Sequence, residues 1–73
     1  MVEKAEEYLK ECGLSEVRVR CQGSTARIEI PQEELKNFFN NYNVIELVQY
    51  FSNLGFNCTS LDLEGLVSGK LNR

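Results

Sequence analysis

The sequence predicts a small α+β domain in which a three-stranded, mostly antiparallel sheet carries helices on one face. The spacing of apolar residues, and the order of elements that it gives, predict this fold. Apolar residues recur at helical spacing, then alternate with polar residues as in strands, and then return to helical spacing. The resulting order of elements is helix, strand, strand, helix, helix, strand. The 73 residues form one domain, residues 1–73, with a modest core, because a chain of this size buries only about 60% of the surface of its unfolded form.

The first helix is expected to end at Gly13. Apolar residues three or four positions apart define one face of it, and charged residues fill the other positions. The apolar residues are Val2, Ala5, Leu9 and Cys12. Gly13 suits the left-handed conformation that often follows a helix, with Leu14 folding back onto the last turn.

A β-hairpin with its turn at Gly23-Ser24 comes next. Apolar residues alternate with polar ones on both sides of this turn. A two-residue loop pairs Val17 with Ile30, Val19 with Ile28 and Cys21 with Ala26. All six apolar side chains then share one face. A slip of one residue would destroy this agreement, so the pattern specifies the register.

The second half of the chain predicts two helices and a strand. Pro31 suits the first position of a helix, and the acidic residues after it favour the positive end of the helix dipole. The buried side of this helix is expected to hold Leu35, Phe38 and Phe39.

Asn43 and Glu46 form a capping pair at the start of the next helix, which Gly55 ends. Its apolar stripe is Val44, Leu47, Val48, Phe51 and Leu54. The last strand is expected from Asn57 to Leu63, and a right-handed crossover would lay it beside the first strand.

Composition excludes several classes of function. The net charge of −3 argues against binding to nucleic acids, which depends on clustered Lys and Arg. No apolar run approaches the roughly 20 residues that span a bilayer, and the acidic start does not resemble a secretory signal, so we expect a cytoplasmic protein without membrane contact. The three cysteines, Cys12, Cys21 and Cys58, form no CxxC pair, and the chain has no histidine. We therefore expect no metal site and reduced thiols that mostly fill the core.

The polar face of the hairpin is the candidate binding site. The register places Arg18 opposite Glu29 and Arg20 opposite Arg27. Like charges that face each other across two strands repel, unless an anion joins them. Arg18, Arg20 and Arg27 could therefore bind a phosphorylated ligand. The alternative is a solvated, salt-bridged surface on which Glu29 balances one of the arginines.

Other polar residues give weaker indications. Asp62 and Glu64 are expected on one side of the last strand. Paired carboxylates there could act as acid and base or hold a metal. The alternative is that they are ordinary exposed residues at the edge of the sheet. Gly65 to Gly69 could cradle an anion but lacks the Walker spacing. Cys12 lies where the helix dipole disfavours a thiolate. We therefore assign no catalytic residue.

Three segments carry a resemblance to a known family. They are Leu-Asp-Leu-Glu-Gly-Leu-Val-Ser-Gly-Lys-Leu-Asn at 61–72, Val-Arg-Val-Arg at 17–20 and Ala-Arg-Ile-Glu-Ile-Pro at 26–31. Together they resemble the C-terminal region of the ATP-dependent sacrificial sulfur transferases (LarE-like) of the PP-loop ATP-pyrophosphatase superfamily. These enzymes act in making the nickel-pincer cofactor of lactate racemase.

The resemblance implies roles for a few residues of this chain. Arg18 and Arg20 match arginines near the sulfur-transfer site of the family, and Glu6, or else Glu7, matches a helical glutamate of that site. The family binds ATP and magnesium in a preceding domain with an SGGxDS loop, which this sequence lacks, so no cofactor is expected in this chain. The tail departs from the family pattern, since Leu66 and Val67 replace a tyrosine and an arginine.

The expected function is therefore that of an accessory C-terminal domain, which is not an enzyme alone. It would contribute phosphate-binding arginines and assembly contacts. Its expected partners are an ATP-binding PP-loop domain, in cis or in trans, a phosphorylated small-molecule substrate and further copies of itself. Two alternatives stay open. One is a stand-alone oligomerisation domain that uses a strand edge with Tyr42, Tyr50 and Phe56. The other is a KH-like nucleic-acid-binding module, although the loop between the helices lacks the GxxG of that family.

Overall fold

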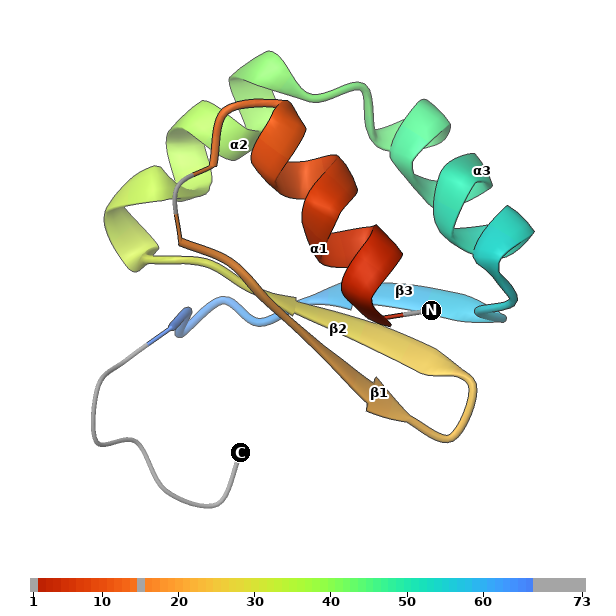
Figure 1. The fold of residues 1–73 in the computed structure, drawn as a ribbon. Coiled ribbons are helices and arrows are strands. Elements are labelled where there is room, and N and C mark those ends of the chain that lie inside the picture. The colour runs from red at the N-terminus through yellow and green to blue at the C-terminus, as the bar shows by residue number, and fades with distance from the viewer. Residues whose placement is uncertain (1, 15, 67–73) are drawn as a thin grey trace.

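The computed structural model describes residues 2–14 and 16–66 and confirms the predicted order of elements. The elements are α1 (Val2–Glu11), β1 (Arg18–Gln22), β2 (Thr25–Glu29), the 3-10 helix η1 (Gln32–Glu34), α2 (Leu35–Asn41), α3 (Val44–Leu54) and β3 (Cys58–Leu61). All three α-helices lie on one face of the sheet (Figure 1). The fold class is the α+β domain that the sequence predicts.

The three strands form a mixed sheet in the order β1-β2-β3. β1 and β2 are antiparallel, whereas β2 and β3 are parallel. The expectation that the last strand lies beside the first was therefore wrong. The hairpin already covers one edge of β2, so the chain that returns from the helices pairs with the other edge of β2 and makes that strand the central one.

The predicted register of the hairpin is confirmed. Arg18 pairs with Glu29, Val19 with Ile28, Arg20 with Arg27 and Cys21 with Ala26. Gly23 adopts a positive φ of 60° in the turn, a conformation that glycine adopts without steric cost. The alternation of side chains across the strands thus separates an apolar face under the helices from a polar face that points away from them.

The core lies between the helices and the apolar face of the sheet. Leu9, Ile28, Ile30 and Phe51 are its largest fully buried side chains. Phe56 is also buried, so it is not available for the subunit interface proposed from the sequence.

The two tyrosines of that proposed interface also make contacts within the domain. The ring of Tyr50 stacks on Tyr8 with 4.3 Å between centroids. The hydroxyl of Tyr42 donates a hydrogen bond of 2.7 Å to the carbonyl oxygen of Leu9. Both side chains are half-buried, so their aromatic surface is largely used in holding the helices to one another.

The helix ends follow the sequence closely. Gly13 has a φ of 119° after α1, and the Leu14 side chain folds back into the core. The side-chain oxygen of Asn43 accepts a hydrogen bond of 3.1 Å from the backbone N–H of Glu46, which is the predicted cap. Gly55 ends α3 in the left-handed conformation.

Helix α2 differs from the prediction. Its expected first turn is the 3-10 helix η1, so α2 itself has only seven residues. Phe38 faces the core, whereas Phe39 is 55% exposed. In α3, Leu47 and Phe51 are buried, but Val44 and Val48 are nearly half exposed. The sequence pattern alone could not show that the sheet ends before it covers the outer side of these helices.

The cysteines are not core residues, contrary to the expectation. Cys12, Cys21 and Cys58 are all exposed. Cys12 lies in the turn after α1, and Cys21 and Cys58 lie at the end of the sheet near the hairpin turn. The thiol of Cys21 lies 3.3 Å from the carbonyl oxygen of Gly23 in the hairpin turn.

A turn follows β3 where the sequence suggested two more strand residues. The Asp62 carboxylate accepts a hydrogen bond of 2.9 Å from the N–H of Glu64, and the N–H of Gly65 donates to the Asp62 carbonyl over 3.0 Å. The N–H groups of Asp62 and Leu66 then bond to the carbonyls of Ile28 and Ile30. Asp62 and Glu64 therefore belong to a turn that fastens the chain to the central strand.

Among residues 2–14 and 16–66, no helix has both the length and the apolar character that crossing a bilayer requires.

Candidate functional site

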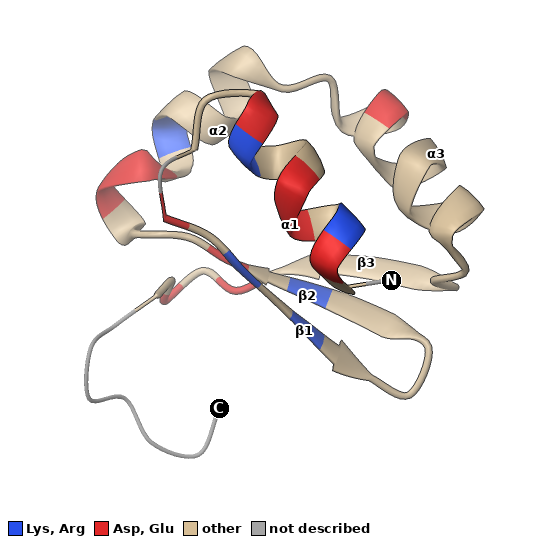
Figure 2. Ribbon diagram, in the orientation of Figure 1, with Lys and Arg blue, Asp and Glu red and all other residues tan. Residues whose placement is uncertain are grey.

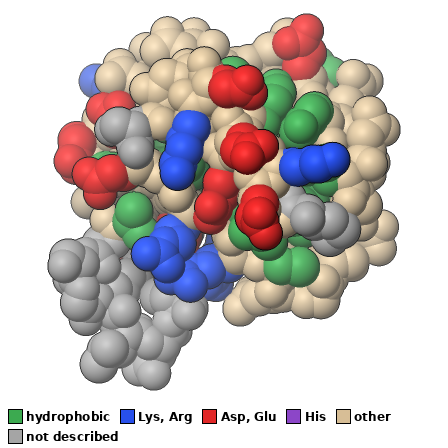
Figure 3. Space-filling model, viewed as in Figure 1, with side chains coloured by type: hydrophobic (Ala, Val, Ile, Leu, Met, Phe, Trp, Pro, Cys, Tyr) green, Lys and Arg blue, Asp and Glu red, His purple; other side chains and the backbone are tan. Residues whose placement is uncertain are grey.

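The sheet face that points away from the helices carries the candidate site. Arg18 and Arg20 project from β1, and Arg27 and Glu29 project from β2. Figure 2 shows these basic residues along the two strands of the hairpin. In Figure 3 their side chains gather at the lower edge of the molecule, beside the acidic side chains that lie over α1. The structure therefore brings together the three arginines that the sequence selected.

Glu29 organises this cluster. Its side chain is only 4% exposed, and its Oε1 accepts a hydrogen bond of 3.3 Å from Nε of Arg20. Its Oε2 lies 3.2 Å from Nη2 of Arg27. The sequence suggested that Glu29 balances one arginine, whereas it balances two. Because one carboxylate lies between the two guanidinium groups, the repulsion between the facing Arg20 and Arg27 is relieved without any ligand.

The three arginines differ in how free they are to bind a ligand. Arg27 is 18% exposed, and its Nε is buried without a hydrogen-bond partner in the described part of the chain. Arg20 is 42% exposed, and Glu29 holds it through Nε. Arg18 is exposed, and no ion pair of it is found with residues 2–14 or 16–66. Arg18 and the outer end of Arg20 are thus the groups most able to contact a ligand.

Glu6 lies at the edge of β1 and has a structural partner. Its Oε2 accepts a hydrogen bond of 2.9 Å from the backbone N–H of Val19. Val19 lies between Arg18 and Arg20 in the strand, so the fold brings Glu6 to the backbone between two of the candidate arginines. The hydrogen bond satisfies a backbone donor at an outer strand of the sheet, and Glu7 is exposed to solvent.

The described residues contain no group of three His, Cys, Asp or Glu side chains that could hold a metal ion. Of the glycine segment 65–69 suggested as an anion cradle, residues 67–69 lie outside the described residues. Gly65 itself packs against the chain: a Cβ there would lie 2.5 Å from the carbonyl oxygen of Ile30. What the arginine face offers is binding of an anion by guanidinium groups, which can hold a phosphate through two hydrogen bonds each.

Sequence reasoning missed the central role of Glu29. It placed the residue opposite Arg18 and expected it to balance one arginine of a solvated surface, not to join two of them as a buried carboxylate. One signal could have found it: in the run Arg-Ile-Glu-Ile, Glu29 shares the face of Arg27 and stands diagonally across from Arg20. Diagonal neighbours on paired strands are within reach of long side chains.

Comparison with known proteins supports the resemblance noted in the sequence. No family model matches the chain. The chain is 50% identical over 72 residues to an uncharacterized protein of Synechocystis sp., and this match covers 99% of the chain and 27% of that protein. It is 39% identical over 70 residues to a pyridinium-3,5-bisthiocarboxylic acid mononucleotide synthase of Lactiplantibacillus plantarum, a match that covers 93% of the chain and 24% of the synthase. The chain thus spans about a quarter of the length of each of these relatives and is similar to one part of a synthase of the LarE-like kind.

Proposed function

We propose that this chain acts as the C-terminal, substrate-phosphate-binding part of an ATP-dependent sulfur transferase of the LarE-like type. The similarity to a quarter of the Lactiplantibacillus plantarum synthase supports this proposal. The name of that synthase describes a mononucleotide, a class of molecule that carries a phosphate group. An anionic ligand of that class needs a cationic binding surface.

The observation that carries the proposal is the unequal engagement of the arginines. A face that served only as a salt-bridged surface would neutralise its charges internally. Here Glu29 compensates Arg27 and part of Arg20, so positive charge is left on the outer side of β1. Arg18 and the terminal nitrogens of Arg20 can close around one phosphate in the two-pronged manner that guanidinium groups favour.

The buried residues of the cluster prepare this geometry. Glu29 fixes the Nε of Arg20, which lowers the number of side-chain conformations that a ligand has to select. Glu6 fixes the backbone of β1 between the two arginines. Arg27 holds Glu29 in place and contacts the ligand least, because its guanidinium group is mostly buried.

Chemistry is assigned to another part of the enzyme. We propose that ATP and magnesium bind to a PP-loop domain, supplied in cis or in trans, and that this chain carries no cofactor and catalyses nothing alone. Its role is to hold the phosphate of the small-molecule substrate while the reacting groups lie elsewhere. The setting proposed for this reaction is the cytoplasm, with no nucleic acid or membrane involved.

An NMR titration of the ¹⁵N-labelled chain tests the proposal. Inorganic phosphate, AMP and nicotinate mononucleotide are added in turn at low salt, where exposed charges are least screened. Two exposed arginines without the rest of an enzyme are expected to bind a phosphate with a dissociation constant of about 1 mM, which corresponds to about −4 kcal/mol. Saturable shifts should centre on residues 18–20.

A matched pair of variants makes this titration specific. Arg18→Gln should weaken phosphate binding several-fold, whereas Lys36→Gln removes the same charge from an exposed position of α2 and should leave binding unchanged. Shifts that are absent or spread evenly over the surface would contradict the proposal. Equal weakening by the two variants would show a general charge effect in place of a site.

A second candidate function is an assembly domain. The exposed apolar surface between α2, α3 and β3 favours this function. An assembly contact there is compatible with phosphate binding on the opposite face of the sheet.

A further inference from the structure

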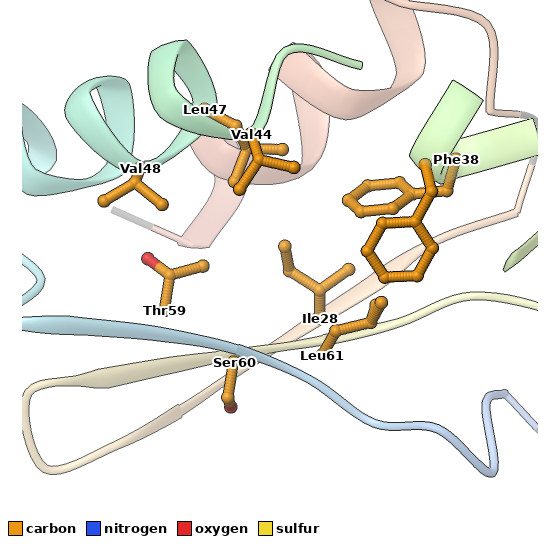
Figure 4. Close-up of a pocket in the computed structure, with 9 residues that line it drawn as sticks. Ile28, Phe38, Val44, Leu47, Val48, Thr59, Ser60 and Leu61 are labelled. Carbon is orange, nitrogen blue, oxygen red and sulfur yellow. The ribbon is translucent and has the colours of Figure 1, made fainter. Parts of the chain in front are cut away.

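The exposed apolar side chains of α2 and α3 gather next to β3. Phe39, Val44 and Val48 are between 45% and 55% exposed. Together with Thr59 and Leu61 of β3 they line what we name the apolar groove, whose floor is formed by buried core residues (Figure 4). In Figure 4, Val48 and Val44 point down from α3 toward the strand, and Thr59 points up toward them.

The apolar groove is unsuited to a small molecule. Its volume is about 100 Å³, whereas pockets for small molecules usually enclose about 300–1,000 Å³. Its lining is almost entirely apolar and lacks charged side chains. A shallow apolar surface of this kind fits a protein partner.

The groove opens beside the free edge of the sheet. β3 is paired with β2 on one side, and its other side is an edge in the described sheet. The opposite edge, at β1, is protected in two ways, since Glu6 occupies the N–H of Val19 and charged arginines project from the strand. β3 reads Cys-Thr-Ser-Leu and has neither the charges nor the proline that commonly prevent an edge strand from pairing.

Charge distribution identifies the occupant. No charged residue occurs between Leu47 and Leu61, although 26% of the chain is charged and its net charge is −3. Two copies of a negatively charged protein repel each other least where both are neutral. A basic partner finds no acidic side chain between Leu47 and Leu61 with which to pair, and a nucleic acid finds no basic one. The neutral edge therefore fits a second copy of the same chain.

We infer that two copies of this protein pair through β3, antiparallel and about a two-fold axis. Such an isologous contact matches a surface with itself. The joint sheet has six strands, three from each copy, with all helices on one side. The two apolar grooves meet above the paired strands, so each copy covers Val44 and Val48 of the other. This inference does not rest on phosphate binding, because the arginine face lies on the other side of the sheet.

Sedimentation equilibrium over protein concentrations from about 10 μM to about 1 mM, a range that detects weak association, tests the inference. The mass should rise toward twice the 8.4 kDa of one chain. Hydrogen exchange of the β3 amides should slow at high concentration, because their outer N–H groups become bonded. Exchange in β1 should not change with concentration.

Two variants distinguish association through this interface from non-specific hydrophobic association. Val48→Glu places a charge in the groove and should keep the protein monomeric at the concentration where the wild type associates. Leu63→Glu makes the same kind of change at a residue that is 68% exposed outside the groove and should associate as the wild type does. A wild-type mass of one chain at about 1 mM, where weak dimers are detected, overturns the inference. So does equal association of Val48→Glu and wild type. If Val48→Glu fails to fold, β3 exchange that does not depend on wild-type concentration is the contradicting result.

Discussion

Replacing Glu29 by alanine should destabilise the domain more than the loss of an ordinary carboxylate from the polar face of the sheet would. The Glu29 side chain is 4% exposed and contacts two guanidinium groups. Its removal leaves Arg27, which is 18% exposed, with a mostly buried and uncompensated positive charge. The cost of this change therefore comes mainly from the cation that stays behind.

The two ion pairs contribute unequally to the expected loss. Breaking a fully buried pair from one side costs about 3–5 kcal/mol, and the partial exposure of Arg27 lowers this to about 2–3 kcal/mol. Arg20 is 42% exposed, so its pair behaves as a surface contact worth about 0.2–1 kcal/mol. The sum is about 2–4 kcal/mol. A domain of 73 residues has a total stability of about 4–11 kcal/mol, so Glu29→Ala should remove a large part of it.

Urea unfolding followed by circular dichroism measures this loss directly. Glu29→Gln keeps the shape and an acceptor oxygen, and should lose roughly half as much as Glu29→Ala. Combining Glu29→Leu with Arg27→Leu removes both charges and should recover most of the stability, since a buried pair can be replaced by apolar residues at little cost. A loss below about 0.5 kcal/mol for Glu29→Ala, the size of an ordinary surface change, would refute the assignment of Glu29 as the buried counter-ion.

Two further perturbations test other parts of the account. Gly65→Ala should cost about 2–4 kcal/mol in urea unfolding, because φ is +79° and the new Cβ would lie 2.5 Å from the Ile30 carbonyl. Gly13→Ala has a positive φ but open space around it, so it should cost at least about 1 kcal/mol less. Equal losses would contradict the close packing of the turn after β3. Burial, with a smaller contribution from Cys12, raises the pKa of Tyr42 from 10.0 to about 12. Because this folded-state pKa lies above the unfolded value, the stability that Tyr42 contributes is complete below pH 10 and is lost as the pH rises toward about 12. Tyr42→Phe should flatten the fall in unfolding free energy across that window, and identical slopes for the two proteins would contradict the raised pKa of Tyr42.

The hairpin and the helix caps could be predicted because they depend on local patterns. Glycine at a positive φ, an asparagine cap and a strict alternation of apolar residues each specify a geometry within a few residues. The register of β1 and β2 follows from the alternation together with the two-residue turn, since a slip of one residue would expose Val19 or Ile28.

The placement of β3 and of the cysteines depends on longer-range packing. Whether the returning strand joins β1 or β2 is decided by where the chain leaves the helices, and the periodicity of residues does not contain that information. Cys21 follows the apolar alternation, yet it lies beside the hairpin turn and is exposed. Periodicity shows which face a side chain occupies, but it cannot show how far the covering layer extends.

The candidate site was predictable in its members but not in its organisation. Strand alternation and register placed Arg18, Arg20 and Arg27 on one face. The contacts of Glu29 with Arg20, diagonally across the strands, and with Arg27, two residues away on β2, depend on side-chain conformations. The ligand class proposed for the arginine face comes from the similarity to a synthase, because the electrostatics alone does not specify one.

The measurement that tests the phosphate-binding proposal most directly is an NMR spectrum of the arginine Nε–Hε groups. It is recorded with nicotinate mononucleotide and then with the corresponding nucleoside, which lacks the phosphate. The signals of Arg18 and Arg20 should move with the mononucleotide alone, while Arg27 stays in its ion pair with Glu29. Equal shifts with the nucleoside, or no shifts at Arg18 and Arg20, would contradict phosphate binding by this face.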